Sequence, residues 1–377
     1  MTVHGAGTLT TRRGNAERGR EGRISGYVLK VIRESAGLTQ ERFAERLGLD
    51  VTTIQGWESG RRSLMAVSTG TYLSLRHWLL RLGVRSRLLA QLDMALEADR
   101  FVGYVLSTEP GKVEAEDHPL ASWVIKRPFT DLVAWPFTKT APSAVAGVVR
   151  GTGRRGPVAT APSLLPDERA HFFEHLKAVA EGADTDRVDG MLLRRQAHYV
   201  ASFDDTSDTA DWLTAMQRAE ERRMGRAGEW TPSWAVVRSG AHSLARLGDR
   251  EGLQHFIRVH LADEICEMAN LNYWAYWLGE VGEPQLADTF MVELNPDVWR
   301  GTELLRHLAD KLDSANPYLD VVAHTLWALV MLRPSALDTQ SMDALRDAAV
   351  RTLDEATASP QSKRELEAVI YALCMIH

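Results

Sequence analysis

The chain has 377 residues, 45% hydrophobic and 25% charged, which is enough for two or three globular domains and excludes a disordered or fibrous protein. Its two cysteines, Cys266 and Cys374, exclude a disulfide framework, and no segment has the length and hydrophobicity of a signal peptide or a membrane span, so we expect a cytoplasmic protein with no membrane partner. The net charge of −6 is uneven, because the first 100 residues hold 16 Lys/Arg and 10 Asp/Glu, whereas the remainder holds 28 and 40.

The first hundred residues are therefore the basic part of the chain. Residues 1–23 are rich in Gly, Thr and Arg and lack hydrophobic periodicity, which predicts a disordered basic arm. Residues 24–106 predict a domain of five or six short helices. Since a basic region attracts polyanions, we expect a polyanionic partner for this part of the chain and not for the acidic remainder.

Residues 37–62, GLTQERFAERLGLDVTTIQGWESGRR, contain the signals of two short helices joined by a tight turn. Thr39 is a favourable N-cap for a first helix over residues 40–47. Gly48 suits a turn that needs a left-handed backbone, and Asp50 then caps the second helix. The pattern predicts a helical hairpin with an outward-facing second helix.

This segment resembles the helix-turn-helix of the Cro/C1 (XRE) family of phage-type repressors. The resemblance implies a sequence-specific DNA-binding transcriptional regulator whose second helix is the recognition helix. It also implies contacts with the DNA backbone at Thr39, Gln40 and Ser59, and a structural ion pair between Arg33 and Glu58. The alternative is a helical hairpin that packs without touching DNA.

Small and polar side chains on the outer side of the recognition helix suit the major groove. Gln55 can make a bidentate contact with adenine, and Val51, Thr52 or Thr53 can contact thymine methyl groups. The glutamines that usually read bases at the start of this helix are replaced here by valine and threonine. The operator sequence therefore cannot be inferred.

Three further residues complete the predicted DNA-binding surface. Gly56 lies on the outer face but brings no side chain to a base, and it lowers helix propensity by about 1 kcal/mol. Arg61 and Arg62 follow the helix and are expected to add sequence-independent attraction to phosphates.

A single short recognition helix reads too few bases for specificity in a genome, which predicts a homodimer on a two-fold symmetric operator in double-stranded DNA. The segment 86–106 is the candidate for pairing the two copies, because Leu88, Leu92, Leu96 and Val105 lie along one side of it.

Residues 107–166 contain eight prolines, which predicts a Pro/Gly-rich connector with one or two short helices near residues 120–137. Within it, residues 151–156 match the G-x-G-x-x-G pattern of dinucleotide sites. The prolines that follow leave no helix N-terminus to receive phosphates, so a flexible basic linker is the favoured interpretation.

Residues 171–175 match the H-x-x-E-H pattern of inverted zinc peptidases, with His171 and His175 on one face of a helix. This match supports one alternative function, a metal-dependent hydrolase with an accessory DNA-binding domain. No third ligand segment follows and strand signals are almost absent, so an amphipathic surface helix is the favoured interpretation.

Helical periodicity dominates residues 167–377, and residues 245–256 recur as 279–290 after 34 residues, with Gly248 matching Gly282 and Phe256 matching Phe290. The pitch resembles that of tetratricopeptide (TPR) repeats. The resemblance implies a TPR-like α-solenoid that serves regulation and dimerisation. Because this part of the chain is acidic, a basic or peptide-like effector is the favoured partner for its concave face.

The segment 270–277 contains a possible ligand-binding cluster, since Asn270, Tyr273, Trp274 and Trp277 fall at helical spacing. Packing in the helical core is the alternative for these side chains. The sequence as a whole predicts an all-α, dimeric repressor controlled by a small molecule or peptide, with no cofactor, metal or catalytic residue. A constitutive repressor whose C-terminal part only contacts proteins remains an open alternative.

Overall fold

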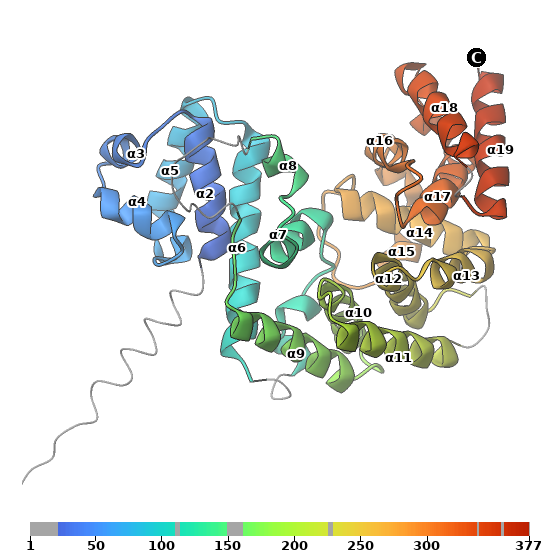
Figure 1. Ribbon diagram of the computed structural model, residues 1–377, viewed down its shortest axis with the longest axis horizontal. Coiled ribbons are helices and arrows are strands. Elements are labelled where there is room, and N and C mark those ends of the chain that lie inside the picture. Colours follow the sequence, from blue (N-terminus) through green and yellow to red (C-terminus); the bar gives the residue numbers. More distant parts are fainter. Residues whose placement is uncertain are drawn as a thin grey trace, which may run out of the picture. The chain divides into compact units, whose positions relative to one another are not determined.

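The computed structural model describes residues 22–109, 114–148, 161–224, 229–337, 339–355 and 358–376 (Figure 1). Within these ranges the secondary structure is helical and contains no strand, which confirms the predicted all-α fold. No helix of the described part is long and apolar enough to cross a membrane. The basic arm, up to residue 21, and the glycine motif at 151–156 lie outside the described residues.

The chain divides into two compact units, which differ from the predicted domains 24–106, 107–166 and 167–377. Unit 1 comprises Met1–Lys112 and Pro128–His175, and unit 2 comprises Val113–Arg127 and Leu176–His377. The segment predicted as a connector therefore contributes to both units.

Unit 1 is built around the contact between its first and longest helices. α2 packs along α6 and against α4, and the carboxylate of Asp99 in α6 accepts hydrogen bonds from the backbone N–H groups of Ile24 (2.9 Å) and Ser25 (2.8 Å). These bonds satisfy two of the four N–H groups that have no partner at the start of a helix. The helices of this part are α2 (Arg23–Ser35), α3 (Gln40–Leu47), α4 (Val51–Glu58), α5 (Thr69–Arg81) and α6 (Ser86–Ser107), with a 3₁₀ turn η1 (Leu64–Ala66).

The segment predicted as a connector contains a short helix where one was expected, α7 (Arg127–Thr138), and a second one after it, α8 (Ser143–Ala146). Phe129 packs on Phe101 at 5.9 Å between ring centroids, and Phe137 packs on Phe172 of α9 (Pro166–Gly182) at 4.8 Å. These rings are buried, so the segment is part of the core of unit 1. The second residue of α7 is Pro128, and the first turn of a helix accepts proline without losing a hydrogen bond.

Unit 2 consists of helices that pack both on their neighbours in the chain and on helices further along it. α10 packs on α12, which also contacts α11 and α13, and α17 contacts α16, α13 and α19. In Figure 1 these helices run from green to red along the chain. Their bounds are α10 (Val188–Ala201), α11 (Ser207–Arg223), α12 (Pro232–Arg246), α13 (Arg250–His260), α14 (Glu264–Leu278), α15 (Phe290–Glu293), α16 (Thr302–Lys311), α17 (Leu319–Leu332), α18 (Thr339–Asp354) and α19 (Pro360–Ile376), with 3₁₀ turns η2 (Ala115–Asp117), η3 (Pro119–Ala121), η4 (Pro296–Val298) and η5 (Pro334–Ala336).

The two copies of the 34-residue pattern fold differently. Gly248 forms the left-handed turn between α12 and α13 (φ +105°), and the side chain of Asp249 caps α13. In the second copy the helix before the turn ends two residues earlier, at Leu278, and the following helix is only the four-residue α15. A TPR-like repeat therefore stays a prediction.

Candidate nucleic-acid interface

Each of the two helices α3 and α4 begins with the N-cap residue that the sequence predicts. Thr39 accepts a hydrogen bond from the backbone N–H of Arg42 (3.2 Å), and Asp50 accepts one from that of Thr52 (2.7 Å). Between the two helices Gly48 has a left-handed backbone (φ +66°). The turn between α3 and α4 is thus defined by residues close in sequence.

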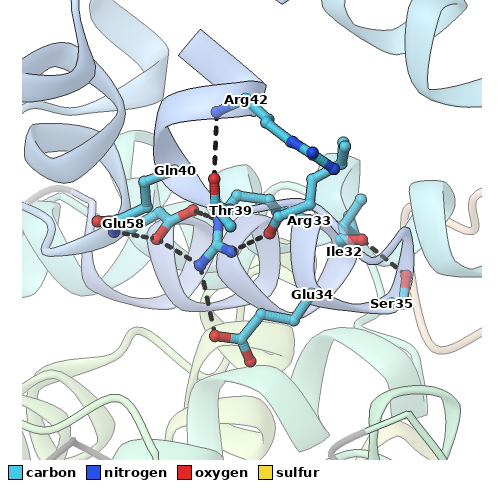
Figure 2. A network of polar contacts seen from close by, with 9 residues as sticks. Ile32, Arg33, Glu34, Ser35, Thr39, Gln40, Arg42 and Glu58 are labelled. Carbon is cyan, nitrogen blue, oxygen red and sulfur yellow. Dashed lines mark hydrogen bonds and ion pairs between the residues drawn. The ribbon is translucent and has the colours of Figure 1, made fainter.

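A buried network holds the inner side of this motif together (Figure 2). Arg33 of α2 donates two hydrogen bonds to the carboxylate of Glu58 in α4, from Nε to Oε1 at 2.5 Å and from Nη2 to Oε2 at 3.1 Å. A third bond runs from Arg33 Nη1 to the carbonyl oxygen of Leu38 (2.6 Å). Both charged side chains are almost completely buried, so this bidentate pair fixes α4 against α2.

Gln40, predicted to contact the DNA backbone, belongs to the same network. Its Nε2 donates to Glu58 Oε2 at 2.7 Å, so its amide ties α3 to α4 (Figure 2). The side chain is half-buried. The Arg33–Glu58 pair is thereby linked to all three helices of the motif.

The outer side of α4 presents the predicted base-reading residues. Thr52 is exposed at the start of the helix, and Val51, Thr53 and Gln55 are half-exposed. Two hydrogen bonds from Thr52 lower the pKa of Asp50, and the bond from its hydroxyl has a larger effect than the bond from its backbone N–H. The inner side of the same helix buries Ile54 in the core.

Gly56, predicted to lie on the outer face of α4, is covered by the side chain of Arg62. A Cβ at Gly56 would lie only 3.0 Å from Cδ and 3.1 Å from Cγ of Arg62. Arg62 folds back over the helix: its backbone N–H donates to the carbonyl of Gly56 (3.0 Å) and its Nη1 donates to Thr53 Oγ1 (3.2 Å). The missing side chain thus makes room for an arginine beside the residues predicted to read bases.

Ser59 and Arg61 form an exposed polar pair at the end of α4. The Ser59 hydroxyl donates to the carbonyl of Gln55 (2.6 Å), and Arg61 Nε donates to Ser59 Oγ (3.1 Å). The guanidinium of Arg61 therefore stays near the C-terminal end of the recognition helix.

The histidines of the H-x-x-E-H pattern are occupied by contacts within unit 1. His171 Nε2 donates to the carbonyl oxygen of Val105 (3.1 Å), and the ring of His175 packs edge-on against Tyr104. Burial lowers the pKa of His175. Across the described ranges no group of three His, Cys, Asp or Glu side chains is placed to hold a metal. The packing of α9 accounts for the pattern.

Three of the four predicted ligand-binding residues lie together in unit 2. Tyr273, Trp274 and Trp277 line a cavity of about 370 Å³. Asn270 does not line it; this asparagine is fully buried and accepts a hydrogen bond from Arg238 Nε at 2.8 Å. Asn270 therefore positions an arginine and is not open to a ligand.

The cavity contains basic residues that sequence reasoning missed. Arg238, His242 and Arg246 of α12 all line it. A signal was present, because these residues are spaced by four along an otherwise apolar helix and so share one face. The predicted preference for a basic partner is wrong for this cavity, since its described lining contains no Asp or Glu.

One comparison with known proteins found a similarity. A family model described as helix-turn-helix matches residues 29–66, which span the end of α2, α3, α4 and η1. No curated protein and no solved structure matches the chain. The N-terminal helix-turn-helix predicted from the sequence is confirmed by this match, which covers a small part of the chain.

Proposed function

We propose that this protein is a sequence-specific, DNA-binding transcriptional regulator that reads DNA with α4 and acts as a homodimer. The observation that carries the proposal is the helix-turn-helix at residues 29–66, whose recognition helix is fixed on its inner side and polar on its outer side. Such a helix fits the major groove, where each base pair presents a distinct set of donors and acceptors.

Within this proposal the contacts fall into two classes. The bases are read by Gln55, Thr52 and Arg62. Arg62 joins this class because its side chain lies across the outer face of α4 at Thr53. Arg61 and Ser59, with the N-terminus of α3, hold the phosphate backbone. This division changes the role of Arg62 from general attraction to specific recognition.

The proposed dimer contact lies on unit 1, where the segment 86–106 buries most of its predicted contact residues. Leu92 and Val105 are at most 1% exposed, so they belong to the core of the unit itself. On α5, in contrast, Leu73 and Leu80 are 45% and 44% exposed, and they lie two helical turns apart on one side. We assign the dimer contact to this face of α5.

In the proposed mechanism the protein represses by occupying its operator, and unit 2 serves regulation as a TPR-like body. Neither a catalytic step nor a cofactor is part of the proposal. An effector bound to unit 2 changes DNA affinity only if it prefers one arrangement of the two DNA-binding units. Constitutive repression is the outcome if unit 2 binds no effector.

The test begins with selection of bound duplexes from a random pool, followed by titration of variants. Gln55→Ala should weaken binding by about 1–3 kcal/mol and relax the preference at one base position. Arg61→Ala should weaken all duplexes alike and reduce the salt dependence. Arg218→Ala, which removes an exposed charge from α11, should leave binding unchanged. Equal affinity of all three variants for the selected duplex would show that α4 does not read DNA.

A further inference from the structure

The arginines buried in this protein differ in one respect. Four are buried in the described chain, and three of them have a carboxylate within 2.7 Å: Arg33 has Glu58, Arg194 has Glu220 and Arg195 has Asp288. Arg238 makes no ion pair with any described residue, although it is only 3% exposed. Burial of an unpaired charge costs several kcal/mol, so such a group needs another source of negative charge.

No carboxylate is in direct contact with Arg238, although the charge of Glu267 acts on it at longer range. Its Nε donates to Asn270, and its guanidinium lies 4.2 Å from the centroid of the Tyr273 ring. Burial, together with the charge of Arg195, lowers the pKa of Arg238 to about 10. For Arg195 itself, burial also acts to lower the pKa, but Asp288 outweighs it and raises it. The environment of Arg238 thus lacks the anion that the other buried arginines have.

A second arginine of α12 repeats this arrangement on the same cavity. Arg246 Nη1 donates to Ser202 Oγ (2.6 Å) and its Nη2 donates to the hydroxyl of Tyr199 (3.0 Å). Burial raises the pKa of Tyr199 to about 12, so this partner is neutral at physiological pH. Arg127 and Lys311 also line the cavity, which gives it four cationic side chains.

Most of the remaining wall of the cavity is aromatic. The rings of Tyr273 and Trp277 are parallel to within 15° at 6.1 Å, and Trp274 and His242 lie beside them. His242 Nδ1 donates to the carbonyl of Arg238 (2.8 Å), which leaves Nε2 as an acceptor that has no partner among the described residues. Trp274 Nε1 is a buried donor in the same situation. The volume, about 370 Å³, suits a small molecule and not a folded partner.

We propose that this cavity binds a small anion with a planar ring, whose carboxylate or phosphate pairs with Arg238 and Arg246 and whose ring packs on Trp274 and Trp277. The evidence for the binding site comes from the geometry of unit 2 alone. Its role as the effector site rests on the proposed DNA-binding function.

Calorimetric titration of the full chain tests the site with named probes. Indole-3-acetate and 4-hydroxybenzoate represent a carboxylate on a ring, phenyl phosphate represents a phosphate, and 4-hydroxybenzamide is the neutral counterpart. At least one anionic probe should bind at least tenfold more tightly than the amide. Whether the carboxylates or the phosphate bind more tightly identifies the anionic group. Equal binding of anions and amide, or no binding of any anion at 5 mM, would overturn the proposal.

Variants separate this role of Arg238 from a structural one. Arg238→Gln should weaken anion binding at least tenfold while leaving the melting temperature of the free protein unchanged or higher, because it removes an unpaired buried charge. Arg195→Gln should lower the melting temperature, because it leaves Asp288 unpaired. Arg258→Gln on α13 is the exposed control and should bind like the wild type. Undiminished anion binding by Arg238→Gln contradicts the assignment of Arg238 to the anion site. If this variant does not fold, the comparison of anion with amide on the wild-type protein still tests the site.

Adding the bound anion to the complex with a selected duplex tests the effector role separately. A change in DNA affinity supports it, and an unchanged affinity overturns the effector role alone. If the wild-type protein binds none of the anions but still binds the selected duplex, the cavity proposal is refuted and the proposed function stands.

Discussion

Arg33 and Glu58 are the two residues on which the position of the recognition helix depends most. Each would be costly to bury alone, but together they share two hydrogen bonds, and Gln40 satisfies a further position on the carboxylate. The pairing could be predicted from the sequence, because the resemblance places these two residues. The contribution of Gln40 could not, since it depends on how α3 rotates once it has packed.

A double-mutant cycle measures this coupling. Arg33→Ala and Glu58→Ala should each destabilise α2 to α4 by about 3–5 kcal/mol, because each leaves a buried charge unpaired, and the double variant should lose less than the sum. The free energy of local opening is measured by hydrogen exchange of peptides from these helices in the full chain. The exposed pair Glu303 and Arg306 on α16 is the control, with a coupling of at most about 1 kcal/mol. Additive losses at Arg33 and Glu58 would contradict a coupled pair.

The environment of Gly56 could be predicted only in part. The sequence indicates correctly that glycine brings no side chain to a base, but the space it leaves is filled by Arg62 from beyond the helix. A helical pattern assigns faces only to residues of the helix itself. The side chain that covers such a face comes from a turn whose direction the pattern does not contain.

At the scale of elements, α2 and α4 can approach closely because α2 has a glycine at the crossing. A Cβ on Gly26 would lie 2.1 Å from the carbonyl oxygen of Trp57, and a backbone atom cannot move aside as a flexible side chain can. The sequence predicts α4 from its cap and residue pattern, and α2 only as one of the short helices of residues 24–106. It does not identify the crossing point, which only the packed pair defines.

Gly26→Ala should therefore destabilise unit 1 by about 1–3 kcal/mol, since the added methyl group forces the recognition helix away from α2. Gly70→Ala on α5 is the matched control: no atom lies within 4 Å of its added Cβ, and alanine raises helix propensity. Thermal unfolding and hydrogen exchange of the full-length variants distinguish the two substitutions. Equal stability of Gly26→Ala and wild type would show that α2 and α4 do not cross as described.

Elements with prolines or irregular repeats were the hardest to predict. Proline content suggested a connector at residues 107–166, yet proline in the first turn of α7 costs no hydrogen bond, and aromatic burial decides the outcome. The 34-residue pattern predicted a second helix of full length, but α15 is one turn long. Regular helices such as α12 and α17, in contrast, follow directly from their apolar periodicity.

At the scale of the whole molecule, net charge was informative for one part of the chain and misleading for the other. The first 100 residues are basic, in keeping with a DNA-binding unit. Residues 101–377 are acidic overall, but the cavity of unit 2 gathers Arg238 and Arg246 without a carboxylate in its described lining. The net charge of a long segment does not show how charges are arranged around a single binding site.

If the proposed function is correct, the full chain reads a specific DNA sequence as a dimer. Protection mapping on a duplex selected from a random pool measures this with wild-type protein at several salt concentrations. We expect two protected half-sites related by a two-fold axis and centred about one helical turn apart, or a multiple of it, with affinity falling steeply as salt rises. Selection without any enriched sequence, or uniform protection of unrelated duplexes, would contradict it.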